Sequence, residues 1–169
     1  SYSKKIIVEN LDELKNANLD SKPVIFISGH FNNFELMAMQ LEKLGVNLAA
    51  IYRPLNNTYL NKTMEHIRRN FICKKQIKKG RPGSRELIKN FKDGNSIALM
   101  IDQRVREGIY VNFFNKPAST TTIPAQLVKK YNCEIVPIYI ERKEKIFFRM
   151  KILNPISFKN NESIEEITL

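Results

Sequence analysis

Short apolar runs alternate with amphipathic stretches along most of this chain. Four runs have the length and composition of buried strands, and they occupy residues 24–27, 47–52, 96–101 and 134–140. Between them, apolar side chains recur every three or four residues, as they do on one face of a helix. Three such stripes are visible: Phe34, Met37, Leu41 and Leu44; Leu60, Met64, Ile67 and Phe71; and Leu87, Ile88 and Phe91. Strands that alternate with helices predict an α/β fold, with a mainly parallel central sheet and helices on both of its faces.

Residues that start or stop regular structure support these boundaries. Gly45 ends the first helix, Pro54 stops the second strand, and Pro124 lies in the first turn of a helix that follows a threonine run. Residues 146–150 form an apolar strand that should run antiparallel to the strand before it, after a turn at 141–144. Three segments are not assigned to strands: residues 1–20 should form a short helix or a leading segment, residues 74–81 are too charged to be core, and residues 104–118 should form a loop.

Length and composition indicate one globular domain. Of the 169 residues, 43% are apolar, and no linker or repeat divides them, so we expect a single domain over residues 1–169. No apolar run approaches the roughly 18 residues of a membrane-spanning helix, and no signal peptide is visible. The two cysteines, Cys73 and Cys133, are far apart and should be free thiols. With only two histidines, the sequence offers no zinc-type cluster, and we expect no metal.

Positive charge is concentrated in one part of the chain. The formal net charge is +11, and residues 62–92 contribute eleven lysines and arginines against two glutamates. Such a segment suits phosphates, an anionic membrane or an acidic protein, although a solvated basic face without a partner has the same composition. The segment lacks the interleaved aromatic residues of many nucleic-acid-binding surfaces, so we expect no nucleic acid among the partners.

The candidate chemistry begins where the first buried strand ends. Gly29 and His30 follow this strand directly, and a helical pattern begins just after them. In open α/β sheets, ligands bind at the carboxyl ends of the strands. Glu35, one turn into the predicted helix, would accept a proton from one imidazole nitrogen and leave the other nitrogen free as a general base. A histidine that only caps the helix would give the same pattern.

Two further strand ends carry polar side chains that can reach the same edge of the sheet. Arg53 follows the second strand and has a charged, planar fork suited to phosphate. Asp102 follows the third strand, where it could pair with a neighbouring arginine. Each residue also has an ordinary structural explanation, as an arginine after a strand or a carboxylate that caps a turn. If the strands are parallel, His30, Arg53 and Asp102 should lie together at one edge.

Taken in order, these segments resemble a known family. A histidine, four residues and an acid after a buried strand look like the first motif of the lysophospholipid acyltransferase superfamily. The form His-Phe-Asn-Asn-Phe-Glu at 30–35 is especially similar to its lipid A biosynthesis branch, the late (lauroyl/myristoyl-type) acyltransferases. Further similar segments follow in the same order: Tyr-Arg-Pro at 52–54, Asp-Gln at 102–103, Phe-Phe-Asn-Lys-Pro-Ala at 113–118 and Ile-Val-Pro-Ile at 135–138.

The resemblance implies a fold, an activity and a set of site residues. The fold would be the α/β sandwich of glycerolipid acyltransferases. The activity would be O-acyl transfer from a thioester of acyl carrier protein or coenzyme A to a hydroxyl of a lipid A precursor, without a metal or cofactor. His30 would be the general base and Glu35 would orient it. The residues expected to bind substrates are polar or basic: Arg53, Arg81, Arg85, Asp102, Gln103 and Arg104.

The resemblance also implies partners and a location. The partners would be a lipid acceptor, the acyl donor and an anionic membrane surface, at the cytoplasmic face of the bacterial inner membrane. Family members carry a membrane helix before this region and a tryptophan-rich tail after it, whereas this chain has no tryptophan. We therefore expect a truncated core that is soluble or peripheral. Three alternatives stay open: an acyltransferase for another glycolipid or lysophospholipid, a basic nucleic-acid- or membrane-binding module without catalysis, and an inactive scaffold.

Overall fold

Seven strands form one sheet that runs through the molecule. The computed structural model describes residues 5–17 and 22–169, and the strand order is β1-β9-β8-β2-β5-β3-β4. Neighbouring strands are parallel except for β8 and β9, which form an antiparallel hairpin as predicted. The strands are β1 (Ile6–Glu9), β2 (Ile25–Ser28), β3 (Leu48–Tyr52), β4 (Lys75–Lys78), β5 (Ser96–Met100), β8 (Ile135–Glu144) and β9 (Phe147–Ile152). The predicted mainly parallel sheet is therefore confirmed.

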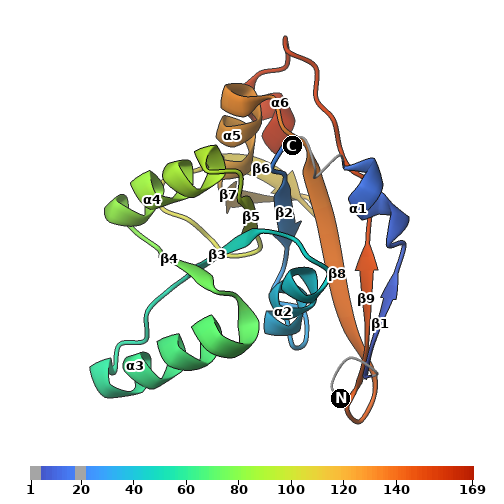
Figure 1. The fold of residues 1–169 in the computed structure, drawn as a ribbon. Helices are drawn as coiled ribbons and strands as arrows, with labels where there is room; N and C mark the ends of the chain where they lie inside the picture. Colours follow the sequence, from blue (N-terminus) through green and yellow to red (C-terminus); the bar gives the residue numbers. More distant parts are fainter. Residues whose placement is uncertain (1–4, 18–21) are drawn as a thin grey trace.

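Helices cover both faces of this sheet, which confirms the predicted α/β architecture (Figure 1). One face packs against α1 (Asp12–Asn16) and α2 (Glu35–Lys43), and the other against α4 (Arg81–Lys92), α5 (Ile123–Tyr131) and α6 (Ile164–Thr168). Side chains along the buried strand β2 point alternately to the two faces of the sheet. Phe26 therefore packs in the core on the side of α1 and α2, and Ile25 packs in the core on the side of α4, α5 and α6. Within the described ranges, no helix combines the length and apolar character needed to cross a membrane.

One helix stands apart from these two layers. The α3 helix (Thr58–Ile67) continues directly into a π-helical turn, η2 (Arg68–Ile72), and α3 lies at the opposite end of the molecule from α5 and α6 (Figure 1). The side chain of Asn57 caps α3 by accepting hydrogen bonds from the first backbone N–H groups. The helix is where its apolar stripe predicts it, yet none of the residues in α3 or η2, all of them described, is buried.

Two segments that the sequence did not assign to strands contribute edge strands to the sheet. In the described part of residues 1–20, β1 pairs in parallel with β9, and α1 follows; residues 1–4 and 18–21 lie outside the described residues. The basic segment 74–81 contains β4, in which Lys75 and Lys78 are exposed while Gln76 and Ile77 are buried. A charged segment can join the sheet at its edge because the lysine side chains stay exposed there. Lysines on an edge strand also discourage pairing with other chains.

The predicted loop at 104–118 and the predicted turn at 141–144 are also wrong. The first contains a hairpin of β6 (Ile109–Phe113) and β7 (Lys116–Thr120). Its turn residues, Phe114 and Asn115, have left-handed φ values of 49° and 62°. Such turns usually contain Asn-Gly or Asp-Gly, so the sequence lacks the usual signal. At 141–144, the strand β8 continues to Glu144 because Glu141 pairs with an arginine across the hairpin.

Candidate active site

Three strand ends meet at one edge of the sheet, as the sequence predicts. Because β2, β5 and β3 are parallel neighbours, the residues that follow them emerge on the same side. His30 and Arg53 line one cavity there, and Asp102 contacts His30 directly. The expected meeting of these three residues at one edge is confirmed.

Asp102 holds His30 in place with both of its carboxylate oxygens. The backbone N–H of His30 donates to Oδ2 at 2.8 Å, and ring Nδ1 lies 2.7 Å from Oδ1. Burial alone would raise the pKa of Asp102, but the hydrogen bonds from His30 outweigh it and keep the pKa below its usual value. The carboxylate can therefore accept a hydrogen bond from Nδ1–H, which leaves Nε2 as the basic nitrogen. Gly29 permits this approach, since a Cβ there would lie 2.9 Å from the Phe31 ring and 3.3 Å from Asp102 Oδ2.

Glu35, predicted to orient His30, has a different partner. Its Oε1 accepts hydrogen bonds from Nε and Nη2 of Arg68 at 2.9 and 2.8 Å, and both side chains are largely buried. The prediction assumed a helix that starts near His30, whereas α2 starts at Glu35 itself, after a turn in which Asn32 has a left-handed φ of 45°. The expected pairing of Asp102 with an arginine is also wrong, because Asp102 pairs with the imidazole of His30. A catalytic role for Glu35 stays a prediction.

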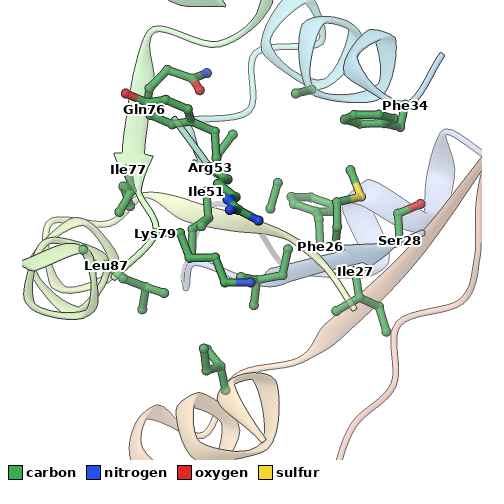
Figure 2. A pocket seen from close by; sticks show the side chains of 18 of the residues that line it. Phe26, Ile27, Ser28, Phe34, Ile51, Arg53, Gln76, Ile77, Lys79 and Leu87 are labelled. Carbon is green, nitrogen blue, oxygen red and sulfur yellow. The ribbon is translucent and has the colours of Figure 1, made fainter. Parts of the chain in front are cut away.

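A cavity of about 350 Å³ opens at this edge of the sheet and reaches both cores. Figure 2 shows the side chains of Arg53 and Lys79 directed into it, next to the ends of β3 and β4. In the described ranges, neither cation forms an ion pair. Apolar side chains make up much of the wall, among them Phe26, Met37, Ile51, Ile77 and Leu87. Such a cavity suits a molecule that combines a hydrocarbon chain with an anionic group.

The remaining predicted binding residues lie in different places. Gln103 lines the cavity, and its side-chain nitrogen lies 3.4 Å from Nε2 of His30. Arg85 and Arg104 are exposed and do not line the cavity. Arg81 begins α4, but its side chain is outside the described part of the structure. Among the residues that are described, no three His, Cys, Asp or Glu side chains gather where they could hold a metal ion.

Sequence reasoning missed Arg68 as a residue of this site. It lies in the cavity wall, at the start of the π-helical turn, with its guanidinium 5.4 Å from the centre of the Tyr52 ring. Its Nη1 atom is buried and has no hydrogen-bond partner in the described part of the chain. A polar stripe was the available signal, because Asn61, Glu65 and Arg68 are spaced by four and three residues, like the apolar stripe beside them. Short π-helical turns are frequent at functional sites.

A hydrogen-bond network fastens the same side of α3 to the sheet. Glu65 Oε1 accepts from the Tyr52 hydroxyl at 2.6 Å, from the Asn61 amide at 2.8 Å and from Lys78 Nζ at 3.1 Å. The hydrogen bonds from Tyr52, Lys78 and Asn61 lower the pKa of Glu65 to about 2. Burial and the contact with Glu65 raise the pKa of Tyr52. The network and the Arg68–Glu35 pair together fix which side of α3 faces the site.

The fold and the site define a class of enzyme. An α/β sheet that presents a carboxylate-bound histidine beside an apolar cavity is suited to general-base chemistry on a substrate with a hydrocarbon chain. The family described as bacterial lipid A biosynthesis acyltransferase matches the sequence over residues 1–169, the whole chain. The chain therefore belongs to this family, and it is an acyltransferase of lipid A and lipopolysaccharide biosynthesis. A comparison with individually curated proteins gave no match.

Proposed function

We propose that this acyltransferase moves a fatty acyl chain from a thioester of acyl carrier protein or coenzyme A to a hydroxyl of a lipid A precursor. The observation that carries the proposal is the His30–Asp102 pair beside an apolar cavity. Family membership supports the class of acceptor. The reaction would take place at the cytoplasmic face of the bacterial inner membrane, where a lipid acceptor meets a donor from the cytoplasm.

In the proposed reaction, Nε2 of His30 takes the proton of the acceptor hydroxyl while the oxygen attacks the thioester carbonyl carbon. A carbon–oxygen bond forms, and the carbon–sulfur bond breaks. The departing thiolate then takes the proton from His30, so the products are an ester and a free thiol. Asp102 stabilises the imidazolium that exists between these steps. No covalent enzyme intermediate, metal or cofactor takes part in this scheme.

Other cavity residues would bind rather than react. The apolar wall would hold a hydrocarbon chain, and Arg53 and Lys79 would bind a phosphate or another anionic group of the substrates. Gln103 contacts Nε2 of His30, and the acceptor hydroxyl would replace this contact. Glu35 would act through Arg68, by holding its guanidinium in the cavity wall.

The test is an acyl-transfer assay with a lipid A precursor and with acyl carrier protein and coenzyme A thioesters as donors. His30→Ala should lower turnover by about 10²–10⁴-fold, the usual contribution of a general base. His66→Ala is the matched control, because His66 is the other histidine of the chain and is exposed on α3. Near-normal turnover in a folded His30→Ala protein would exclude the mechanism. Faster acylation of a lysophospholipid or another glycolipid would replace the proposed acceptor.

A further inference from the structure

The helix α3, with its extension η2, turns polar residues towards the protein and leaves apolar residues exposed, which is the reverse of a helix that packs onto a core. Its half-buried polar residues, Asn61, Glu65 and Arg68, face the body of the protein and make the hydrogen bonds described above. Three residues of its apolar stripe are exposed, with Leu60 58%, Ile67 38% and Phe71 67% accessible, while Met64 between them is half-buried. The helix therefore presents apolar side chains to its surroundings and polar ones to the protein.

This orientation is fixed rather than accidental. Rotating α3 to bury the stripe would break the contacts of Glu65 with Tyr52 and Lys78, and would separate Arg68 from Glu35. Removing one member of a buried ion pair leaves an uncompensated charge, which is costly. Contiguous apolar side chains that a folded protein keeps at its surface mark an interaction site. The stripe is such a site, defined here as Leu60, Met64, Ile67 and Phe71.

Exposed cations on the same helix and just after it favour one kind of partner. Lys62 and Arg69 are exposed on the same helix, and Lys74 is exposed just after η2. The one carboxylate of α3, Glu65, is occupied by Lys78. Exposed apolar residues combined with cations on a surface helix are typical of helices that lie in the interface of an anionic bilayer.

We propose that the stripe inserts into the surface of an anionic phospholipid bilayer, with α3 lying in the interface. The inference rests on the proposed function for its purpose: Arg68 and Ile72 of η2 line the cavity, so the docked helix would border the path of a lipid substrate to His30. The hydrocarbon chains of a lipid substrate would then pass from the membrane into the cavity without exposure to water.

The chain contains no tryptophan, so a single introduced tryptophan reports its own surroundings without interference. Phe71→Trp places the probe on the stripe, and Ile7→Trp places it on β1 at a residue of similar exposure, 63% against 67%. With vesicles of phosphatidylethanolamine and phosphatidylglycerol, the emission of the Phe71→Trp protein should shift to the blue, and lipids brominated on their acyl chains should quench it. The Ile7→Trp protein should show neither effect. Absence of quenching in the Phe71→Trp protein would overturn the proposal.

A second measurement tests the stripe without a probe. Leu60→Ser, Ile67→Ser and Phe71→Ser together should weaken binding to the anionic vesicles by at least about tenfold, since each loses apolar area that insertion would bury. The matched control is Ile7→Ser, Ile146→Ser and Leu153→Ser, which also changes three exposed apolar residues. Equal losses in both variants would overturn the proposal, and so would a stripe variant that keeps its binding to the vesicles but loses its binding to acyl carrier protein that bears no acyl chain. Neither measurement uses a donor or acceptor substrate, so failure of the proposed reaction would not affect them.

Discussion

At the scale of single residues, two carboxylates have partners other than those predicted from the sequence. Asp102 binds the imidazole of His30, while Glu35 binds the guanidinium of Arg68. The positions of His30, Arg53 and Asp102 could be predicted, because each lies within two residues of a strand end and strand ends are visible in the sequence. The pairing could not be predicted, because it depends on the turn between His30 and α2, which has no regular period.

The Glu35–Arg68 pair should contribute measurably to stability because it is largely buried. Glu35→Gln should lower the free energy of unfolding by roughly 1–3 kcal/mol, since it leaves a guanidinium that is 16% exposed without its carboxylate. Glu35→Gln combined with Arg68→Gln should cost less than the sum of the two single changes. Urea unfolding of the four proteins measures both effects.

The surface pair Asp12–Lys15 provides the control for this cycle, because both of its side chains are more than four-fifths exposed, at 86% and 82%. Asp12→Asn should change the free energy of unfolding by less than about 0.5 kcal/mol. If Glu35→Gln had an equally small effect, the buried pair would not stabilise the fold, and Glu35 would have to be explained by catalysis alone.

At the scale of elements, periodic segments were predicted well and edges poorly. The helix α2 and the strands β2, β3 and β5 have clear apolar periods, and each is found within a few residues of its predicted place. The strand β4 was missed because its lysines make the segment look too charged for a sheet, and the hairpin β6–β7 was missed because its turn lacks the usual sequence signal. The helix α3 was predicted from its stripe, but sequence periodicity does not reveal whether a stripe faces a core or the surroundings.

The attachment of α3 through Glu65 should depend on pH. The pKa of Glu65 falls from 4.5 to about 2 in the folded protein, so its carboxylate stabilises the fold above pH 4.5. This contribution is lost as the pH falls from 4.5 towards 2. The Glu65→Gln protein should therefore be less stable than the wild type near neutral pH, and the difference should shrink through this window. Thermal unfolding of both proteins across the window provides the measurement.

A control is available on another helix, because Glu86 is exposed on α4. Glu86→Gln should stay close to the wild type in stability at both ends of the pH window. A difference between wild type and Glu65→Gln that did not change with pH would contradict the assigned hydrogen bonds to the Glu65 carboxylate.

At the scale of the whole molecule, the basic segment 62–92 is not one uniform surface. Lys75 donates to Asn95, Lys78 pairs with Glu65, and Lys79 is directed into the cavity. Lys74, Lys89 and Lys92 are exposed and remain available to an acidic partner. The basic segment is therefore interrupted, because Lys75, Lys78 and Lys79 are engaged within the protein or its cavity while lysines on either side of them are exposed.

Charge reversal at the exposed lysines should show whether they bind an acidic partner. Lys74→Glu, Lys89→Glu and Lys92→Glu together should weaken binding of acyl carrier protein, an acidic partner, by about tenfold at low salt, and by less at physiological salt, where the Debye length is about 8 Å. Titration by fluorescence anisotropy at two salt concentrations measures this. Lys43→Glu, Lys116→Glu and Lys151→Glu change the net charge equally at exposed positions outside the segment. Equal weakening in both variants would show that only net charge matters.

The parallel pairing of β1 with β9 has a consequence for how the molecule is made. The amide of Asn10 just after β1 donates to the carbonyl of Ile152 in β9, 142 positions along the chain. During synthesis, β1 leaves the ribosome long before its partner exists, because translation adds only about 5–20 residues per second. Contacts of such large sequence separation form slowly, since the chain loses entropy before they are made. This edge of the sheet should therefore close last, and the nascent chain must keep β1 from pairing elsewhere until β9 has been made.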